Sequence, residues 1–228
     1  MLVIVSVFLC NENKSVLAMD TGFTTDNMEL EDQKIFLSNI NLSLITQEPP
    51  KNIITCFDVN DNGLIAVGTE DSAKKLVSIY TSDGIFKYGY VFDCEGSFGV
   101  EWDGNNIIIY FVRSGVAALF DEKGKNIDLK VIQDTIDNNS YWNHSVFSTQ
   151  RTVNESQYTI KNNMGLFNIF SSSYSQLIRA DTKGHITIIY DVSREYTVKF
   201  IMISIIVILF VVFVFSLLML KFIKIKNT

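Results

Sequence analysis

The chain has 228 residues, of which 47% are hydrophobic and 19% charged, with a formal net charge of −6 at pH 7. This length allows one core, or a modest core together with a membrane segment. The three lysines of the last eight residues account for +3, so everything before them carries −9, which argues against nucleic acid or an anionic lipid surface as a partner.

Residues 1–18 resemble a secretory signal peptide. An apolar run from Leu2 to Leu9 is followed by a polar stretch and by Val16-Leu17-Ala18, a small-residue cleavage pattern, although no positive residue precedes the run. The alternative is a lipoprotein signal that ends at Cys10, but VFLC lacks the small residue normally found before a lipidated cysteine. We therefore expect cleavage near Ala18.

Residues 19–50 form a leader that precedes the main domain. It contains the acidic stretch MELEDQ and then IFLSNINLSLI, residues 35–45, whose partial alternation of apolar and polar residues predicts one strand. Pro49-Pro50 closes the leader and marks a boundary.

Residues 51–195 form the expected domain, and its sequence repeats. The first unit, Ile53–Phe92, divides at turn signals into IITCFDV, LIAVGT, KLVSIYT and IFKYGYVF. The second, Gly96–Ile132, divides in the same way, and a fainter third spans Ser145–Val192 with MGLFNIFSSSY as an insertion. The clearest echo is a hairpin whose turn ends in Gly, in SIYTSDGIF, ALFDEKGKN and IRADTKGHI. Each unit predicts four antiparallel strands joined by tight turns.

These units resemble the blades of WD40-like and NHL-like β-propeller repeats, with the first unit as the best match. The resemblance covers Ile53–Val192 and implies an all-β fold of about three four-stranded blades. True WD40 blades carry Gly-His and Trp-Asp dipeptides at set positions, whereas Trp102-Asp103 lies in the first strand of the second unit. Three blades imply an incomplete propeller, an irregular one that closes through the leader, or one that assembles with another copy or a partner. The chain is also similar to uncharacterised membrane-anchored proteins of low-GC Gram-positive bacteria.

The C-terminal region predicts a transmembrane helix over residues 199–221. Phe200–Leu220 comprises 21 residues without charge, Gly or Pro, and as a helix it spans roughly the 30 Å hydrocarbon core of a bilayer. The lysines that follow place the basic tail, residues 222–228, in the cytoplasm and the preceding domain outside the cell membrane. A tail-anchored cytoplasmic protein is the alternative, if the N-terminal apolar run is a buried strand.

The stretch DVNDNG offers a weak calcium candidate. Asp58, Asn60 and Asn62 occupy alternate positions, as ligands do in calcium loops. However, Ala66 and Thr69 stand where such loops need a further acid, so an ordinary hairpin turn is the better interpretation. We expect no cofactor and no other metal site. Cleavage of the signal would remove Cys10 and leave Cys56 and Cys94, which either form a disulfide or remain small buried thiols.

The favoured function is a membrane-tethered, non-enzymatic module that binds a protein or another ligand, or acts as a scaffold, and that is also a candidate for self-association. Aromatic residues cluster in the first two units, and they either pack between blades or form a binding surface, for which the candidates are Tyr88, Tyr90 and Trp102. The alternative is an extracytoplasmic hydrolase or lyase. It would require two acids to share a pocket with His144 or His185, and the available acids are Glu101, Asp103, Asp121 and Glu122.

Overall fold

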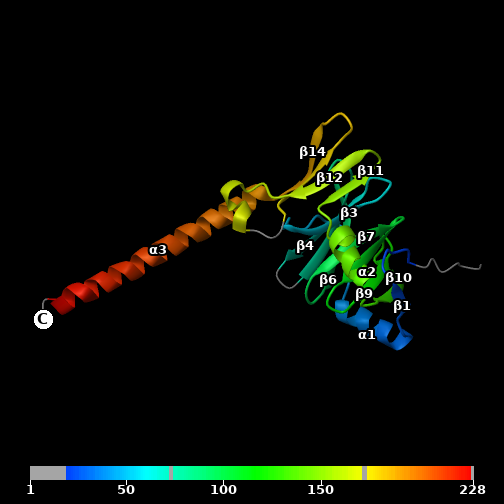
Figure 1. Ribbon diagram of the computed structural model, residues 1–228, viewed down its shortest axis with the longest axis horizontal. Coiled ribbons are helices and arrows are strands. Elements are labelled where there is room, and N and C mark those ends of the chain that lie inside the picture. The colour runs from blue at the N-terminus through cyan, green and yellow to red at the C-terminus, as the bar shows by residue number, and fades with distance from the viewer. Residues whose placement is uncertain (1–18, 72–73, 171–173, 227–228) are drawn as a thin grey trace, which may run out of the picture.

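The chain folds into three antiparallel β-sheets, from which one long C-terminal helix extends (Figure 1). The structure is a computed structural model that describes residues 19–71, 74–170 and 174–226. The expected signal peptide lies outside these described residues. The expectation of a mostly β domain with a C-terminal apolar helix is confirmed, and the sheets of the described residues do not close into a barrel.

The first sheet consists of the four strands expected between Ile53 and Phe92 and of one short edge strand, in the order β2-β6-β5-β4-β3. The strands are β2 (Ser43–Ile45), β3 (Ile54–Val59), β4 (Ile65–Asp71), β5 (Lys74–Tyr80) and β6 (Phe86–Asp93). Most positions of β4 and β5 are buried, because this sheet is covered on both faces.

The second sheet has the same plan, in the order β1-β10-β9-β8-β7. Its strands are β1 (Thr25–Asn27), β7 (Phe98–Asp103), β8 (Asn106–Phe111), β9 (Val116–Phe120) and β10 (Asn126–Ile132). In both sheets the leader supplies an additional antiparallel strand, which pairs with the last strand of the four-stranded unit.

The third sheet has four strands, in the order β11-β12-β13-β14, and no strand from the leader. These are β11 (Gln150–Val153), β12 (Ser156–Lys161), β13 (Gln176–Ala180) and β14 (Ile186–Asp191). The expected insertion between β12 and β13 carries a short 3₁₀ helix, η2 (Gly165–Phe170). The edge strand of the third sheet, β14, alternates between exposed and more buried positions in its first half, which indicates that one face of the sheet is solvated.

The leader contains a helix where one strand was expected over residues 35–45. Helix α1 (Leu30–Ile40) replaces most of that strand, and only Ser43–Ile45 is extended. Phe36, Leu37 and Ile40 have the spacing of one helical face and pack against the core, and Asn41 ends the helix in the left-handed conformation at φ 45°. The prediction failed because partial alternation in a short apolar run also fits a helix.

Four hairpin turns share one local structure. Each begins with a residue whose side-chain oxygen accepts hydrogen bonds from the backbone N–H groups two and four residues later, and each has a glycine at φ between 76° and 80° in its fourth position. The first residues of these turns are Asn60, Thr81, Asp121 and Asp181. Three of them are the repeated hairpins recognised in the sequence, and DVNDNG supplies the fourth.

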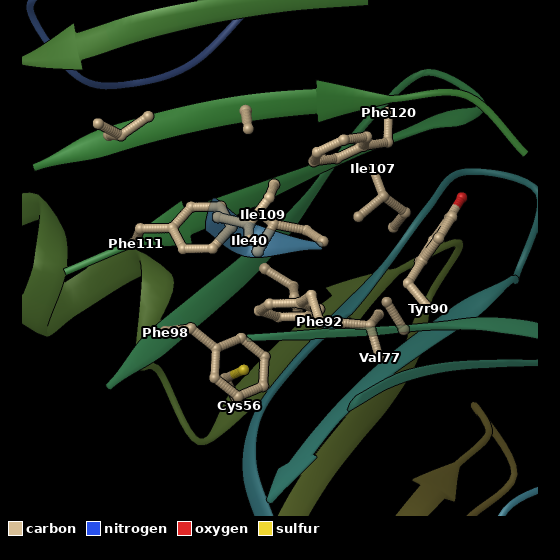
Figure 2. Packing of buried hydrophobic residues seen from close by; sticks show 14 of the residues in the cluster. Ile40, Cys56, Val77, Tyr90, Phe92, Phe98, Ile107, Ile109, Phe111 and Phe120 are labelled. Atoms are coloured by element: carbon tan, nitrogen blue, oxygen red, sulfur yellow. The ribbon is translucent and has the colours of Figure 1, made fainter. Parts of the chain in front are cut away.

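The first sheet lies between the other two, and a separate apolar core fills each interface. Toward the second sheet, the buried ring of Phe92 lies edge-on against Phe98 and Phe111, with ring centroids 5.3 and 5.5 Å apart (Figure 2). Toward the third sheet, Leu177 and Tyr190 pack in one cluster with residues of β3 and β4.

The outer face of the second sheet is covered by the N-terminal part of the leader and by the segment that precedes the third sheet. That segment contains α2 (Ile136–Tyr141) and a π-helical turn, η1 (Trp142–Val146). Phe23 and Val146 are buried against this face.

Helix α3 (Ser193–Lys226) follows β14 almost directly and extends away from the sheets (Figure 1). Ser193–Ser216 is long and apolar enough to cross a membrane: an 18-residue window within it has a mean hydropathy of 3.1, and none of that window is buried against the rest of the protein. A helix long and apolar enough to span a membrane is therefore present where one was expected, and it begins six residues before the expected boundary at position 199. At the start of the helix, Asp191 accepts a hydrogen bond from the Ser193 backbone N–H at 2.7 Å.

Candidate functional site

A single carboxylate, Asp58, connects β3, β7 and β11, each of which lies at one edge of its sheet. It lies on β3, one of its oxygens accepts a hydrogen bond from the Trp102 backbone N–H of β7 at 2.8 Å, and the other pairs with Arg151 Nε of β11 at 2.8 Å. The Asp58 and Arg151 side chains are only 13% and 14% exposed. Burial raises the pKa of Asp58, while Arg151 and the amide of Trp102 favour the charged form.

Arg151 is in turn held by the segment before the third sheet. Its Nη2 donates to the carbonyl oxygen of Ser145 at 2.6 Å, and Nη1 donates to the carbonyl of Gln150 at 3.1 Å. The guanidinium also lies 5.5 Å from the centre of the Phe57 ring. With its donors occupied by protein acceptors, the pair joins the sheets rather than offering a free charge to a ligand.

A second buried polar cluster lies on the outer face of the second sheet. The carboxylate of Glu101 accepts hydrogen bonds from the hydroxyl of Tyr110 at 2.5 Å and from that of Tyr141 at 2.9 Å, and Tyr110 also contacts the Thr21 hydroxyl at 2.7 Å. Burial raises the pKa of Glu101, against the effect of the two tyrosine hydroxyls. Burial beside Glu101 also raises the pKa of both tyrosines. The cluster attaches α2 and the leader to β7 and β8.

The calcium candidate is used as a turn. Asn60 Oδ1 accepts hydrogen bonds from the N–H groups of Asn62 and Leu64 at 3.0 and 2.8 Å, and Asn62 Nδ2 donates to Asn105 Oδ1 at 3.0 Å. Both oxygens of Asp58 already accept protein hydrogen bonds. Among the described residues no group of three or more His, Cys, Asp or Glu residues is arranged to hold a metal ion. The geometry favours the turn interpretation of DVNDNG.

The acids and histidines of the hydrolase alternative have separate partners. Asp103 accepts a hydrogen bond from the Asp20 backbone N–H at 3.1 Å, and Asp121 caps its own turn. His144 Nδ1 lies 2.9 Å from the Ser140 carbonyl oxygen, and His185 lies 3.3 Å from Asp181 in an exposed turn. Within the described part of the chain, neither histidine forms a hydrogen bond or an ion pair with Glu101, Asp103, Asp121 or Glu122.

The three candidate surface aromatics pack largely inside the protein. Tyr90 is fully buried, and its hydroxyl donates to the Asp121 carbonyl oxygen at 2.8 Å. The Tyr88 ring is half-buried edge-on against Tyr90, with centroids 5.7 Å apart. Trp102 is partly buried against the core between the first and second sheets, and its indole Nε1 is buried without a hydrogen-bond partner. Tyr90 is therefore a core residue and not part of a binding surface.

Cys56 and Cys94, the two cysteines among the described residues, are free thiols. Cys56 is buried between the first and second sheets, and burial raises its pKa to about 12 (Figure 2). Cys94 is half-buried and lines a groove of about 590 Å³ together with Phe36, Phe111 and Arg113. The disulfide that the sequence left open is not formed, and Cys56 is a small buried hydrophobe as the alternative proposed.

Exposed isoleucines gather at the free side of the third sheet. Ile186 and Ile188 of β14 are 64% and 55% exposed, and they stand on the same face as Ile178 and Ala180 of β13, with which they are in register. Ile85, 65% exposed, lies in the turn between β5 and β6, where Gly84 packs against the Ile189 backbone of β14. We call Ile85, Ile186 and Ile188 the third-sheet patch.

A scan against protein-family models finds no match for this chain, and a search of curated proteins finds no relative. The third-sheet patch is therefore interpreted from its geometry alone. Sequence reasoning missed it, although the run HITIIYDV carries apolar residues at positions that face both sides of a strand. In a sheet covered on one face, half of those residues must be exposed.

Proposed function

We propose that this chain is a single-pass membrane protein that holds a β-sheet module outside the cytoplasm, where the module binds another protein through the third-sheet patch. The observation that carries the proposal is the exposed apolar side of the third sheet, in a molecule whose other two sheets are covered on both faces.

The membrane anchor is supported by α3 and by the charges that flank its apolar segment. The lysines at 221, 224 and 226 follow the segment, and the positive-inside rule favours the cytoplasmic side for them. The signal-like residues 1–18 favour the same orientation. In this topology the acidic β-module faces the outside of the cell.

Protein binding is supported by the edge position of β14. Among the described strands, β14 pairs with β13 alone, so its other edge can accept a strand from a partner. Isolated exposed isoleucines are common, but Ile186 and Ile188 are adjacent on one face of the edge strand, and Ile85 follows the glycine whose turn approaches that strand. The partner that fits this surface contributes an extended strand or the apolar face of a sheet.

The resemblance to propeller repeats fits the same proposal. Each sheet contains a four-stranded antiparallel unit, and β3, β7 and β11, the first strands of the three units, meet at Asp58. In this interpretation the three sheets are blades of an incomplete propeller, and the partner, or a second copy of the chain, covers the exposed blade.

Site-specific photocrosslinking in the source cells tests the binding surface. The photoreactive residue p-benzoylphenylalanine replaces Ile188 in the full chain, and in a matched control it replaces Ile136, which is 88% exposed at the start of α2. We expect a discrete protein adduct from position 188 and none from position 136. An adduct with the mass of two chains identifies a second copy as the partner.

Two results overturn the proposal. The first is the absence of an adduct at position 188, or the same adducts at both positions, which would show that the patch is ordinary surface. The second concerns orientation: a protease added to intact cells should degrade the β-module, and full protection would place it in the cytoplasm, as in a tail-anchored protein.

A further inference from the structure

The first turns of α3 are fixed to the β-module without a linker. The Tyr196 hydroxyl donates to Asn52 Oδ1 at 2.6 Å, and Asn52 exchanges hydrogen bonds with the Tyr190 hydroxyl through its backbone N–H and carbonyl groups at 2.7 and 2.6 Å. Val192 is buried in the core between the first and third sheets. The sheets therefore lie at a set height along the helix that crosses the membrane.

The insertion that carries η2 is attached to the same point. The Asn163 backbone N–H donates to Ser175 Oγ at 2.9 Å, and Ser175 Oγ lies 2.9 Å from Ser193 Oγ at the first residue of α3. Ser175 is fully buried, and its carbonyl oxygen accepts a hydrogen bond from the Val192 N–H at 2.9 Å. Figure 1 shows η2, in yellow, beside the first turns of α3 and farther along the helix than the sheets.

Ser193, where the insertion that carries η2 is attached, lies close to the apolar segment of α3. Seven residues, Ser193 to Lys199, precede the uncharged run that begins at Phe200, and they advance the helix by about 10 Å. The interfacial region of a bilayer extends roughly 5 to 10 Å beyond the hydrocarbon core. A segment that is attached at Ser193 and lies along α3 therefore reaches the lipid headgroups.

The sequence and exposure of η2 fit that location. The element reads GLFNIF, in which four of six residues are large and apolar, and it follows the buried Met164. Leu166 is 90% exposed, which is the environment of a residue that faces lipid rather than a core. Tyr196 and Lys199 of α3 are of residue types that favour the membrane–water interface, and the Lys199 ammonium lies 4.6 Å from the centre of the Tyr196 ring.

We infer that η2 is a membrane-interface contact, in which Leu166 inserts among the lipid headgroups beside α3 and holds the β-module in one orientation on the bilayer. The ligand is the lipid surface itself, bound through apolar burial and not through charge. This inference rests on the membrane anchor of the proposed function. With two points of contact, α3 and η2, rotation of the sheets about the helix axis would be restricted.

Fluorescence in lipid nanodiscs tests the contact on the full chain. Leu166→Cys is labelled with an environment-sensitive fluorophore in a background where Cys10 and Cys94 are replaced by Ser, and Ile136→Cys is the matched control because it is equally exposed but lies on α2. Buried Cys56 is retained, since its raised pKa and burial make it unreactive. We expect lipids that carry a nitroxide near the headgroup to reduce emission from position 166 by about half, and from position 136 far less.

Together with a membrane-extraction assay, the quenching results distinguish failure of the η2 contact from failure of the membrane anchor. If alkaline carbonate extracts the chain from membranes, α3 is not a membrane span, and both the anchor and the η2 contact are wrong. If the chain resists extraction but the two positions are quenched equally, only the η2 contact is wrong. Strong quenching at position 166 alone supports it.

Discussion

Strands β5 and β14 are both rich in apolar residues, yet six of the seven positions of β5 are buried, whereas β14 leaves Ile186 and Ile188 more than half exposed. The difference comes from their place in the stack. Strand β5 is central in a sheet with a core on each face, and β14 is the edge strand of a sheet with a core on one face only. Two strands of similar apolar content therefore differ in role: β5 stabilises the core, whereas β14 leaves an apolar surface exposed to solvent.

The largest stability effect is expected at the interface between the first and second sheets. Phe92→Ala removes a fully buried ring that contacts Phe98 and Phe111, and we expect the free energy of unfolding to fall by about 3 to 5 kcal/mol. Urea denaturation of the full chain in detergent micelles, followed by tryptophan fluorescence, measures the change. Ile186→Ala on the third sheet is the control, and equal losses in the two variants would contradict the comparison.

The next effect concerns the link between all three sheets. Asp58→Asn keeps the size of the side chain but removes the charge that pairs with Arg151, and it replaces one of the two oxygens that accept from the Trp102 N–H and Arg151 Nε with an NH2 donor. We expect a loss of about 3 kcal/mol, because a buried guanidinium loses its partner. Asp121→Asn is the matched control, since Asn60 occupies the equivalent turn position and makes the same two hydrogen bonds. A loss from Asp58→Asn no larger than from this control would show that the link is dispensable.

Alanine substitution at two glycines distinguishes the energetic cost of losing a contact between sheets from the cost of the turn conformation itself. Gly84 and Gly184 have φ of 79° and 80° in the same type of turn, but a Cβ on Gly84 would lie 2.8 Å from the Ile189 carbonyl oxygen, whereas one on Gly184 would contact nothing within 4 Å. Alanine at either position should cost about 1 to 2 kcal/mol for the left-handed conformation. Gly84→Ala should cost more, because the turn must move away from β14. Equal midpoints in urea would show that this turn does not support the edge strand.

The covered face of the second sheet should carry a pH dependence opposite in sign to that of the third sheet, where hydrogen bonds lower the pKa of Asp181 and outweigh burial to lower that of Asp191. Burial raises the pKa of Glu101, so the folded state binds more protons than the unfolded state between the ordinary carboxyl pKa and the raised one. Stability should therefore increase as the pH falls from neutral through this window. Glu101→Gln keeps one acceptor oxygen for the Tyr110 and Tyr141 hydroxyls and should flatten the increase, although Asp58 contributes in the same direction. Urea midpoints across a pH series measure the effect, and unchanged profiles would contradict it.

The sequence predicted those parts of the fold that depend on local signals. The turns at Thr81, Asp121 and Asp181 were recognised because an oxygen-bearing side chain and a glycine lie within four residues, and the strands between them followed. The pair Asp58 and Arg151 is separated by 93 residues, so no local pattern connects them. Helix α1 was missed because its apolar residues fit both a strand and a helix.

The sequence predicted the candidate site only in part as well, because local patterns do not determine which residues are buried between sheets. Alternation indicated that about half of the aromatic residues face inward, but it could not select them, and Tyr90 proved to be a core residue. The third-sheet patch depends on which sheet ends the stack, and that is decided by packing between units and not within one unit. A repeat pattern alone treats the three units as equivalent, although only the third has an uncovered face.

The smallest stability effect is expected at the patch itself. Ile188→Thr keeps a β-branched side chain on β14 and removes only exposed apolar surface, so the free energy of unfolding should change by less than about 0.5 kcal/mol. If the patch binds a partner, the same substitution should abolish partner-dependent crosslinking from a photoreactive residue at position 186, because an interface loses affinity when an apolar contact at its centre becomes polar. A variant that is as stable as the parent but fails to crosslink would show that these isoleucines are kept for binding. A large loss of stability would instead assign Ile188 to the core and remove the contrast between β5 and β14.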